Sequence, residues 1–326
     1  MRMRGMIRVT MCRSGMLWVW NEVLMAISGA KVSTAQRMVS CGVFLSNCSE
    51  SEASSSIENI GENYTRYNRN VNSATEKRLI DVNRRFYSEH GRDFSETRLR
   101  LQPGVRRLIE TLHKDESILD LGCGNGELAR TLSREGFHGS YLGLDFSLSL
   151  LNKAEDEAFA FPVRFMESDL SAPGWEAAIG KTKFDLVFAL AVLHHLPGTE
   201  LRLETLDKVH ALLKREGRFL LSNWQFLDNP RLKARIQPWG LIGLSPQEVD
   251  PNDHLLDWKH GSKGLRYVHQ FDENELGELA NKSRFEVRET FYSDGENKRS
   301  GLYQIWKKAI NIPQSEQDVS FFSPQA

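Results

Sequence analysis

The sequence S-I-L-D-L-G-C-G-N-G, residues Ser117 to Gly126, joins a short apolar segment to a cluster of glycines. Its first half, Ser117 to Leu121, predicts a buried parallel strand, because it is apolar apart from its acid. The second half predicts a tight turn, and residues 127–134 then follow a helical pattern. A strand that runs through such a turn into a helix predicts a ligand-binding corner of an α/β sheet.

The glycine spacing indicates which kind of ligand this corner binds. A dinucleotide fingerprint requires G-x-G-x-x-G, and counting from Gly122 places its third glycine at position 127, which is Glu127. An acid at the start of a helix would also repel a pyrophosphate, which favours the positive end of the helix dipole. The spacing therefore disfavours a dinucleotide and favours a cationic or zwitterionic nucleoside without a phosphate.

The pattern Asp120-x-Gly122-x-Gly124-x-Gly126 at a strand end resembles the glycine motif of class I S-adenosylmethionine (SAM) methyltransferases. The resemblance implies a Rossmann-like α/β fold, with a doubly wound, mostly parallel seven-stranded sheet, and SAM as the cofactor. The sequence pattern agrees, because predicted strands alternate with helical stretches. These strands are 117–121, 140–144, 163–166, 184–189 and 218–223, and a helix at 273–282 and strands at 285–291 and 302–306 follow them.

The chain has 326 residues and a mass of 37.2 kDa, which fits one α/β domain of about 200 residues with additional segments. Within the lead-in to this domain, Phe94 to Arg98 predicts a turn. A proline-containing insertion at about 226–266 is too long for a simple connection and predicts a lid. The expected units are an N-terminal extension at 1–59, a helical lead-in and cap at 60–116, the methyltransferase domain at 117–310 and a loose tail at 311–326.

The first 59 residues differ in composition from the rest, because four arginines precede the first acid, Glu22. This pattern fits a dispensable or artefactual extension or an organellar address better than a folded domain. The apolar run at 16–27 is too short to span a bilayer, so no membrane segment is predicted and a cytoplasmic location is expected. The four cysteines show no C-x-x-C spacing and predict neither a disulfide framework nor a zinc site.

By the same resemblance, the residues after each strand contact the cofactor. Asp145 lies about 20 residues beyond the glycine turn, where it would accept the ribose hydroxyls or, alternatively, cap the next helix. Asp169 would accept the adenine amino group, unless it is an ordinary loop acid, and Leu170 would donate its backbone N–H to the ring. The segment 190–196 resembles one whose backbone carbonyls hold the methionine ammonium. The predicted cofactor-binding residues are Asp120, Gly122, Cys123, Gly124, Asp145, Phe146, Ser168, Asp169, Leu170 and Leu190.

Two outer segments resemble the tRNA wobble-uridine carboxymethyl methyltransferases, which esterify a carboxymethyl group on uridine. Residues 94–98 match their F-S-x-T-R pattern, and residues 264–271 resemble R-Y-Y-H-x-F with Val268 replacing the second tyrosine. Either Arg98 or Arg266 would bind a carboxylate of the substrate or of SAM. Tyr267 and Trp224 would stack on a flipped-out base, or else be core aromatics. The predicted catalytic residues are Arg98, His195, Arg266 and Tyr267.

Three functions remain open at this stage. The first is methylation of tRNA, with a small activator subunit as a further partner; the second is methylation of a small carboxylate, phenol or quinone precursor. The third is an inactive RNA-binding or assembly subunit that keeps the fold. The net charge of -1 requires any RNA-binding surface to be a local patch. No metal is predicted, because His194 and His195 have no Cys, Asp or Glu at ligand spacing. Basic residues that would follow phosphates, or form a solvated face, are Arg231, Lys233, Arg235, Lys298, Arg299, Lys307 and Lys308.

Overall fold

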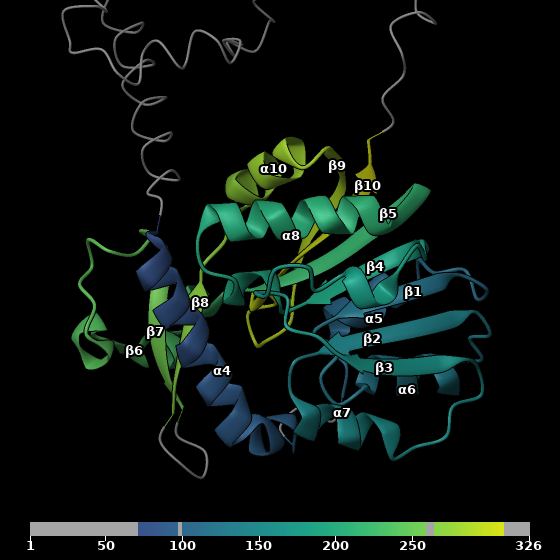
Figure 1. Cartoon of the computed structure of the whole chain (residues 1–326), viewed down its shortest axis with the longest axis horizontal. Coiled ribbons are helices and arrows are strands. Elements are labelled where there is room, and N and C mark those ends of the chain that lie inside the picture. The colour runs from purple at the N-terminus through teal and green to yellow at the C-terminus, as the bar shows by residue number, and fades with distance from the viewer. Residues whose placement is uncertain (1–70, 97–99, 259–263, 310–326) are drawn as a thin grey trace, which may run out of the picture. The chain divides into compact units, whose positions relative to one another are not determined.

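The computed structural model describes residues 71–96, 100–258 and 264–309 (Figure 1). The predicted N-terminal extension at 1–59 and the tail at 311–326 lie outside the described residues, and so does Arg98. Among the residues that are described, no helix combines the length and the apolar character needed to cross a bilayer.

A seven-stranded sheet with the order β3-β2-β1-β4-β5-β10-β9 forms the centre of the molecule. β1 to β5 are parallel, and β10 is antiparallel to both of its neighbours. This arrangement confirms the predicted doubly wound, mostly parallel α/β fold. The strands are β1 (Ser117–Leu121), β2 (Ser140–Asp145), β3 (Val163–Glu167), β4 (Phe184–Leu190), β5 (Leu213–Trp224), β9 (Phe285–Ser293) and β10 (Gly301–Lys308).

Helices cover both faces of this sheet because side chains alternate along the central strands. Leu186 and Phe188 of β4 pack in one core cluster with α5 (Pro103–Ile109) and α6 (Glu127–Arg134). Val187 and Ala189 pack in the other core cluster with α8 (Thr199–Leu212) and α10 (Glu273–Lys282). The connection between β2 and β3 contains α7 (Leu148–Glu155). Chain order reverses at β1, between β2 and β4, which is where such sheets bind ligands.

The insertion after β5 forms a second, three-stranded antiparallel sheet, which we call the insertion sheet. The strands of this sheet lie in the region predicted as a lid at 226–266, and the last strand continues to His269. The elements of the insertion are η3 (Phe226–Asp228), α9 (Pro230–Lys233), β6 (Ile236–Gln237), η4 (Trp239–Ile242), β7 (Asp253–Trp258) and β8 (Gly264–His269).

The long helix α4 (Ser73–Glu96) runs along the insertion sheet and reaches α7 (Figure 1). Its Leu79 is fully buried and shares a small core with Val249 and Tyr267. The turn predicted at 94–98 is wrong for Phe94, Ser95 and Glu96, which continue the helix. A helix buried along one face by tertiary packing extends through residues whose local pattern indicates a turn.

A buried ionic cluster joins the insertion sheet to the main domain. Arg202 of α8 is fully buried and donates a 2.9 Å hydrogen bond from Nη2 to the Tyr267 hydroxyl. That hydroxyl donates in turn to Asp253 Oδ1 at 2.6 Å. His269 lies between Asp253 and Glu275, with its ring nitrogens 2.7 and 2.9 Å from their carboxylate oxygens. Three elements of distant sequence position, α8, β8 and α10, are therefore held together by charge pairing.

Three side chains of the cluster are of types that bind metal ions, and ligand atoms of Asp250, Asp253 and His269 lie within 4.8 Å of one another. Burial opposes a charged imidazole, but Glu275 and Asp253 raise the pKa of His269 above its ordinary value. Arg202 lies 4.0, 3.7 and 3.5 Å from carboxylate oxygens of Asp250, Asp253 and Glu275, so an ion-pair network links these acids.

We predict that Tyr267→Phe lowers the free energy of unfolding by about 1–3 kcal/mol, because Arg202 and Asp253 each lose a buried hydrogen-bond partner. Urea denaturation measures this loss. Tyr292→Phe, at a partly exposed tyrosine, is the matched control and should change stability far less. Equal stability of the Tyr267 variant and the native protein would show that the hydroxyl does not hold the cluster together.

Candidate functional site

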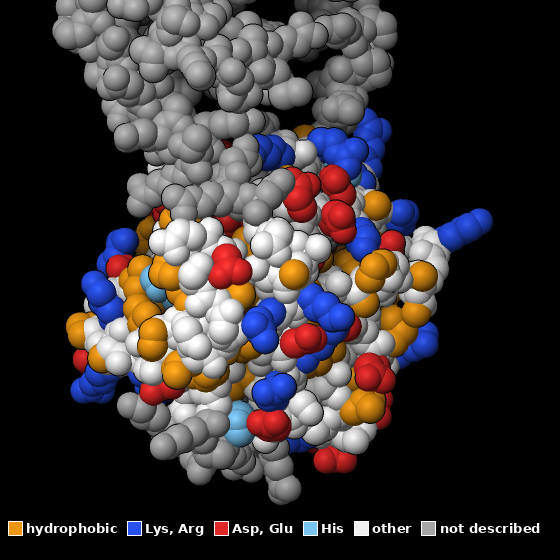
Figure 2. All heavy atoms as spheres, turned by 60° about the vertical axis from the view of Figure 1, so that its left-hand side comes forward, with side chains coloured by type: hydrophobic (Ala, Val, Ile, Leu, Met, Phe, Trp, Pro, Cys, Tyr) orange, Lys and Arg blue, Asp and Glu red, His pale blue; other side chains and the backbone are white. Residues whose placement is uncertain are grey.

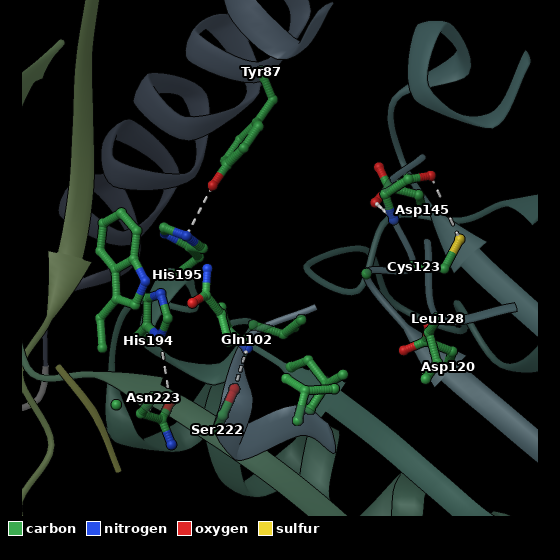
Figure 3. Close-up of a pocket in the computed structure, with 18 of the residues that line it drawn as sticks. Tyr87, Gln102, Asp120, Cys123, Leu128, Asp145, His194, His195, Ser222 and Asn223 are labelled. Carbon is green, nitrogen blue, oxygen red and sulfur yellow. Dashed lines mark hydrogen bonds between the residues drawn. The ribbon is translucent and has the colours of Figure 1, made fainter. Parts of the chain in front are cut away.

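A cavity of about 570 Å³ lies at the carboxyl ends of the five parallel strands (Figure 3). All ten residues predicted to bind a cofactor line it, so the structure brings the whole predicted set together. Helix α4 supplies one wall, and the turn between β9 and β10 supplies another. His195 also lines the cavity, whereas Arg266 and Tyr267 do not.

The glycine turn after β1 has a backbone conformation that is unfavourable for residues with a side chain. Gly122 has a φ of 68°, and a Cβ built on it would lie 2.6 Å from Val192 Cγ2, so a side chain is excluded twice over. Gly124 has a φ of 57° but nothing within 4 Å of its absent Cβ, which leaves open space above the turn. A ligand can therefore approach the backbone at Gly124.

Cys123 lies between these glycines and is buried. Burial raises the pKa of its thiol, as do the neighbouring Asp120 and Asp145. A Cβ added at Gly143 would lie 2.8 Å from the Cys123 sulfur, so the side chain is tightly packed. These features favour a small packing residue over a reactive thiol.

Asp145, at the end of β2, connects the glycine turn to the next helix. Its Oδ2 accepts a 2.9 Å hydrogen bond from the Gly124 backbone N–H, and its Oδ1 accepts one of 2.9 Å from the Ser147 N–H just before α7. Burial raises its pKa, while these N–H donors oppose the rise. The N-cap of α7 is Ser147, so Asp145 binds the residue before the helix and does not cap the first turn, while it also lines the cavity.

Asp120, at the end of β1, is buried and accepts a 2.5 Å hydrogen bond from the Tyr141 hydroxyl. Burial raises its pKa to about 7, the Tyr141 bond lowers it, and Asp145 raises it further. A positive ligand group placed beside this carboxyl would favour its ionised form. The side of the cavity that appears on the right in Figure 3 includes Cys123 and the two carboxyls of Asp120 and Asp145.

Asp169, after β3, is held by a residue of α4. Arg84 donates from Nε to Asp169 Oδ2 at 2.7 Å and from Nη2 to Ser171 Oγ at 3.2 Å. The other carboxylate oxygen accepts the Ser171 N–H at 2.9 Å. Arg84 itself lines the cavity, so it orients Asp169 from the wall that α4 supplies.

His195, after β4, has both ring nitrogens in hydrogen-bond contact. Nδ1 lies 3.1 Å from the Tyr267 carbonyl oxygen, and Nε2 lies 2.9 Å from the Tyr87 hydroxyl (Figure 3). A carbonyl only accepts, so Nδ1 carries a proton, and in the tautomer with Nδ1–H the Nε2 atom accepts from the Tyr87 hydroxyl. Asn83 of α4 completes the arrangement by donating to the His195 carbonyl at 3.2 Å and accepting the Tyr267 N–H at 2.8 Å.

Two of the predicted catalytic residues lie behind the cavity wall. Tyr267 is fully buried in the ionic cluster, so the prediction that it stacks on a substrate base is wrong. Arg266 is also buried, and its guanidinium lies 4.3 Å from the centre of the Trp224 ring. Trp224 itself lines the cavity, so Arg266 supports the wall and does not contact a ligand there. Adjacent residues of a strand point to opposite faces, so the two side chains are buried on different sides of β8. Arg266 packs against Phe86 of α4 and Trp224, whereas the Tyr267 hydroxyl enters the cluster around Arg202.

Sequence patterns missed the contribution of α4 to the site. Asn83, Arg84 and Tyr87 lie within about one turn of one helix, a spacing that also fits an ordinary amphipathic surface. No local signal distinguishes residues that face a cavity from those that face a core. Only the packing of α4 across the sheet ends identifies them.

The fold and the cavity define a Rossmann-like domain that binds a nucleoside-type ligand at a topological switch point. The methyltransferase domain family model matches residues 94–290, which is more than half of the chain. The chain belongs to this family and is a class I SAM-dependent methyltransferase.

Similarities to particular proteins are more distant. A candidate methyltransferase of Encephalitozoon cuniculi is 32% identical over 216 residues, which cover 66% of this chain and 90% of that protein. The tRNA (carboxymethyluridine(34)-5-O)-methyltransferase of Saccharomyces cerevisiae is 26% identical over 157 residues, which cover 47% of this chain and 51% of that protein. A SAM-dependent methyltransferase structure from Methanosarcina mazei has a TM-score of 0.49 at 21% identity and covers 64% of this chain and 99% of that chain.

The residues of the cavity fit SAM, the cofactor of this class. Open space at Gly124 admits a ligand to the backbone, and buried carboxyls at Asp120 and Asp145 suit amino and hydroxyl donors. Glu127 stands where a dinucleotide site has glycine, so phosphate binding is disfavoured.

We predict that Asp120→Asn gains stability over the native protein as pH rises. A pKa raised to about 7 means that the folded protein keeps a proton that the unfolded chain loses above about pH 4, so native stability falls until about pH 7. Asparagine stays neutral throughout. Thermal unfolding at about pH 5 and about pH 8 should therefore show the larger advantage of Asp120→Asn at the higher pH.

Asp185→Asn is the control with the opposite sign. Burial opposes the shift, but Lys214 and Ser117 lower the pKa of Asp185, so its ionised form stabilises the fold. The Asp185→Asn variant should be less stable than the native protein at about pH 8. This difference should shrink as the pH falls through the lowered pKa of Asp185 in the folded protein. A pH-independent effect at Asp120 would contradict the assigned ionisation.

Proposed function

We propose that this methyltransferase esterifies a carboxymethyl group on the wobble uridine of a tRNA. The similarity to the yeast enzyme of that name supports the proposal, together with the segments at 94–98 and 264–271. Within the site, the observation that carries the proposal is the environment of His195. Its ring nitrogens contact the Tyr87 hydroxyl and the Tyr267 carbonyl, so the ring is not poised to take a proton directly from a ligand. A carboxylate acceptor is ionised at neutral pH, so it needs no strong base and depends mainly on positioning.

The proposed cofactor contacts follow from the geometry of the strand ends. Asp145 accepts the ribose hydroxyls, and Asp169, oriented by Arg84, accepts the adenine amino group. The carbonyls at Leu190 and beyond face the amino-acid half, beside Asp120. When bound, SAM supplies an electrophilic methyl group on a sulfonium. The protein holds the acceptor in line with that group and excludes water from the cavity.

The proposed RNA surface flanks the cavity. Arg231 and Lys233 of α9 are exposed beside Asn229 and Leu232, which line the cavity. Exposed Lys298 and Arg299 lie in the turn between β9 and β10, which also lines it. Such residues suit RNA phosphates. Figure 2 shows lysines and arginines scattered among hydrophobic and acidic side chains on the face it presents.

Two of the basic residues predicted to follow phosphates do not belong to this surface. Lys307 and Lys308 lie at the end of β10 away from Gly301, which lines the cavity. Lys307 pairs with Glu216 at 2.7 Å, and Lys308 donates to the backbone carbonyls of α8 and β5. Their position at the end of a predicted strand does not indicate which end of the sheet they occupy.

Arg98 keeps its proposed role of binding a carboxylate, and Arg266 supports the wall behind Trp224. The acceptor side of the cavity then consists of Tyr87, His195 and Trp224. The proposal also includes a cytoplasmic location and a small activator subunit as a second partner.

A second candidate function is methylation of a small phenol or quinone precursor. The hydrogen bond between Tyr87 and His195 favours it, because that pair can accept a proton from a phenolic acceptor through Tyr87 to Nε2. A cavity of about 570 Å³ is also within the usual range for small ligands.

We predict that Asp145→Ala weakens SAM binding by about 1–3 kcal/mol, because ribose hydroxyls and the Gly124 N–H lose an acceptor. Isothermal titration calorimetry measures the change. Asp207→Ala, at an exposed acid that pairs with Arg284, is the control and should bind SAM normally. Unchanged affinity in the Asp145 variant would leave that residue only its contact at the start of α7.

Mass spectrometry of tRNA nucleosides tests the acceptor. Cells that lack this gene should lose the methyl ester at the wobble uridine and accumulate the free carboxymethyl nucleoside. The native chain and its Asp207→Ala variant should restore the ester fully, whereas Asp145→Ala should restore less of it. An unchanged nucleoside profile in the deletion strain would exclude the tRNA proposal and favour the small phenol.

A further inference from the structure

Ala191, the first residue after β4, has a left-handed backbone with a φ of 59°. For a residue with a Cβ this conformation costs about 1–2 kcal/mol, and it persists only when neighbouring groups impose it. Ala191 lines the cavity, together with Leu190 and Val192 on either side. The strain therefore lies in the backbone proposed to face the amino-acid half of SAM.

Ser222 of β5 binds the backbone N–H of Ala191. The Ala191 N–H donates to the Ser222 carbonyl at 3.0 Å and to the Ser222 hydroxyl oxygen at 3.1 Å. The second of these hydrogen bonds is drawn at Ser222 in Figure 3. Ser222 is 7% exposed, so water competes little for the hydroxyl.

The same loop is fixed from its other side by the glycine turn. Val192 Cγ2 occupies the space that a Cβ on Gly122 would need. Since β1, β4 and β5 are adjacent in the sheet, Gly122 and Ser222 hold the loop from two neighbouring strands. The direction of the Leu190 and Ala191 carbonyls is thus set by one packing contact and one two-acceptor hydrogen bond.

We propose that Ser222 is a positioning residue for the cofactor: it holds Ala191 in the left-handed conformation and thereby aims the backbone carbonyls at the ammonium of SAM. Ser222 itself need not contact the ligand. The inference rests on the proposed cofactor contacts and is independent of the methyl acceptor.

The test measures binding of two ligands without any acceptor. S-adenosylhomocysteine carries the amino-acid half, whereas 5′-methylthioadenosine lacks it. Ser222→Ala should weaken S-adenosylhomocysteine binding about three- to tenfold, which corresponds to one net hydrogen bond, and leave 5′-methylthioadenosine binding within about twofold. Calorimetry on the full chain gives both values.

A second substitution separates positioning from a general loss of structure. Ala191→Gly in the Ser222→Ala background should restore S-adenosylhomocysteine affinity, because glycine adopts the left-handed conformation at little cost. Ser283→Ala, at a serine as deeply buried in the loop after α10, is the matched control and should bind both ligands normally.

The outcomes distinguish the possibilities. Equal weakening of both ligands by Ser222→Ala, or failure of Ala191→Gly to restore affinity, would overturn the positioning role and leave Ser222 a packing residue. Affinities of Ser222→Ala within about twofold of native for both ligands would overturn it as well. Failure of the tRNA proposal shows in the nucleoside profile and leaves these affinities unaffected.

Discussion

The close contact between the glycine turn after β1 and the loop after β4 determines the shape of the cavity. Val192 occupies the position of the missing Gly122 side chain, and the turn leaves Gly124 open to a ligand. The same turn directs the Gly124 N–H to Asp145 at the end of β2. The ends of β2, β1 and β4 therefore fix one another, and a side chain at 122 would separate the turn from its neighbour on β4.

Helix α4 adds a second constraint, because it contacts both halves of the cavity. Arg84 orients Asp169 on the cofactor side, while Asn83 and Tyr87 hold His195 and the backbone of β8. Strand β8 is anchored in turn by the buried cluster around Arg202. The insertion sheet is thus joined through α4 to the residues proposed to bind adenine, so the acceptor and cofactor sides are mechanically connected.

The sheet and the cofactor residues could be predicted from sequence because both depend on local patterns. The strand from Ser117 to Leu121 and the helix from Glu273 to Lys282 have the predicted bounds, and ten predicted residues meet in one cavity. The acceptor side could not be predicted in this way. Tyr267 and Arg266 are buried because α4, Trp224 and the cluster around Arg202 all pack on β8, and the contact between α4 and β8 joins segments about 180 residues apart. Ser222 follows the short apolar run 219–221 of β5 and belongs to no motif.

The arrangement of His195 bears on the acceptor more than any sequence match does. An imidazole held at Nδ1 by a carbonyl and at Nε2 by Tyr87 is fixed in orientation and tautomer, and it is not poised to take a proton directly from a ligand. A phenolic acceptor would need Tyr87 to transfer its own proton to Nε2 as it receives another. A carboxylate needs no such transfer, and its alignment with the methyl group is the main requirement. The rigid support around His195 suits that requirement, because orientation is what its hydrogen bonds from α4 and β8 provide.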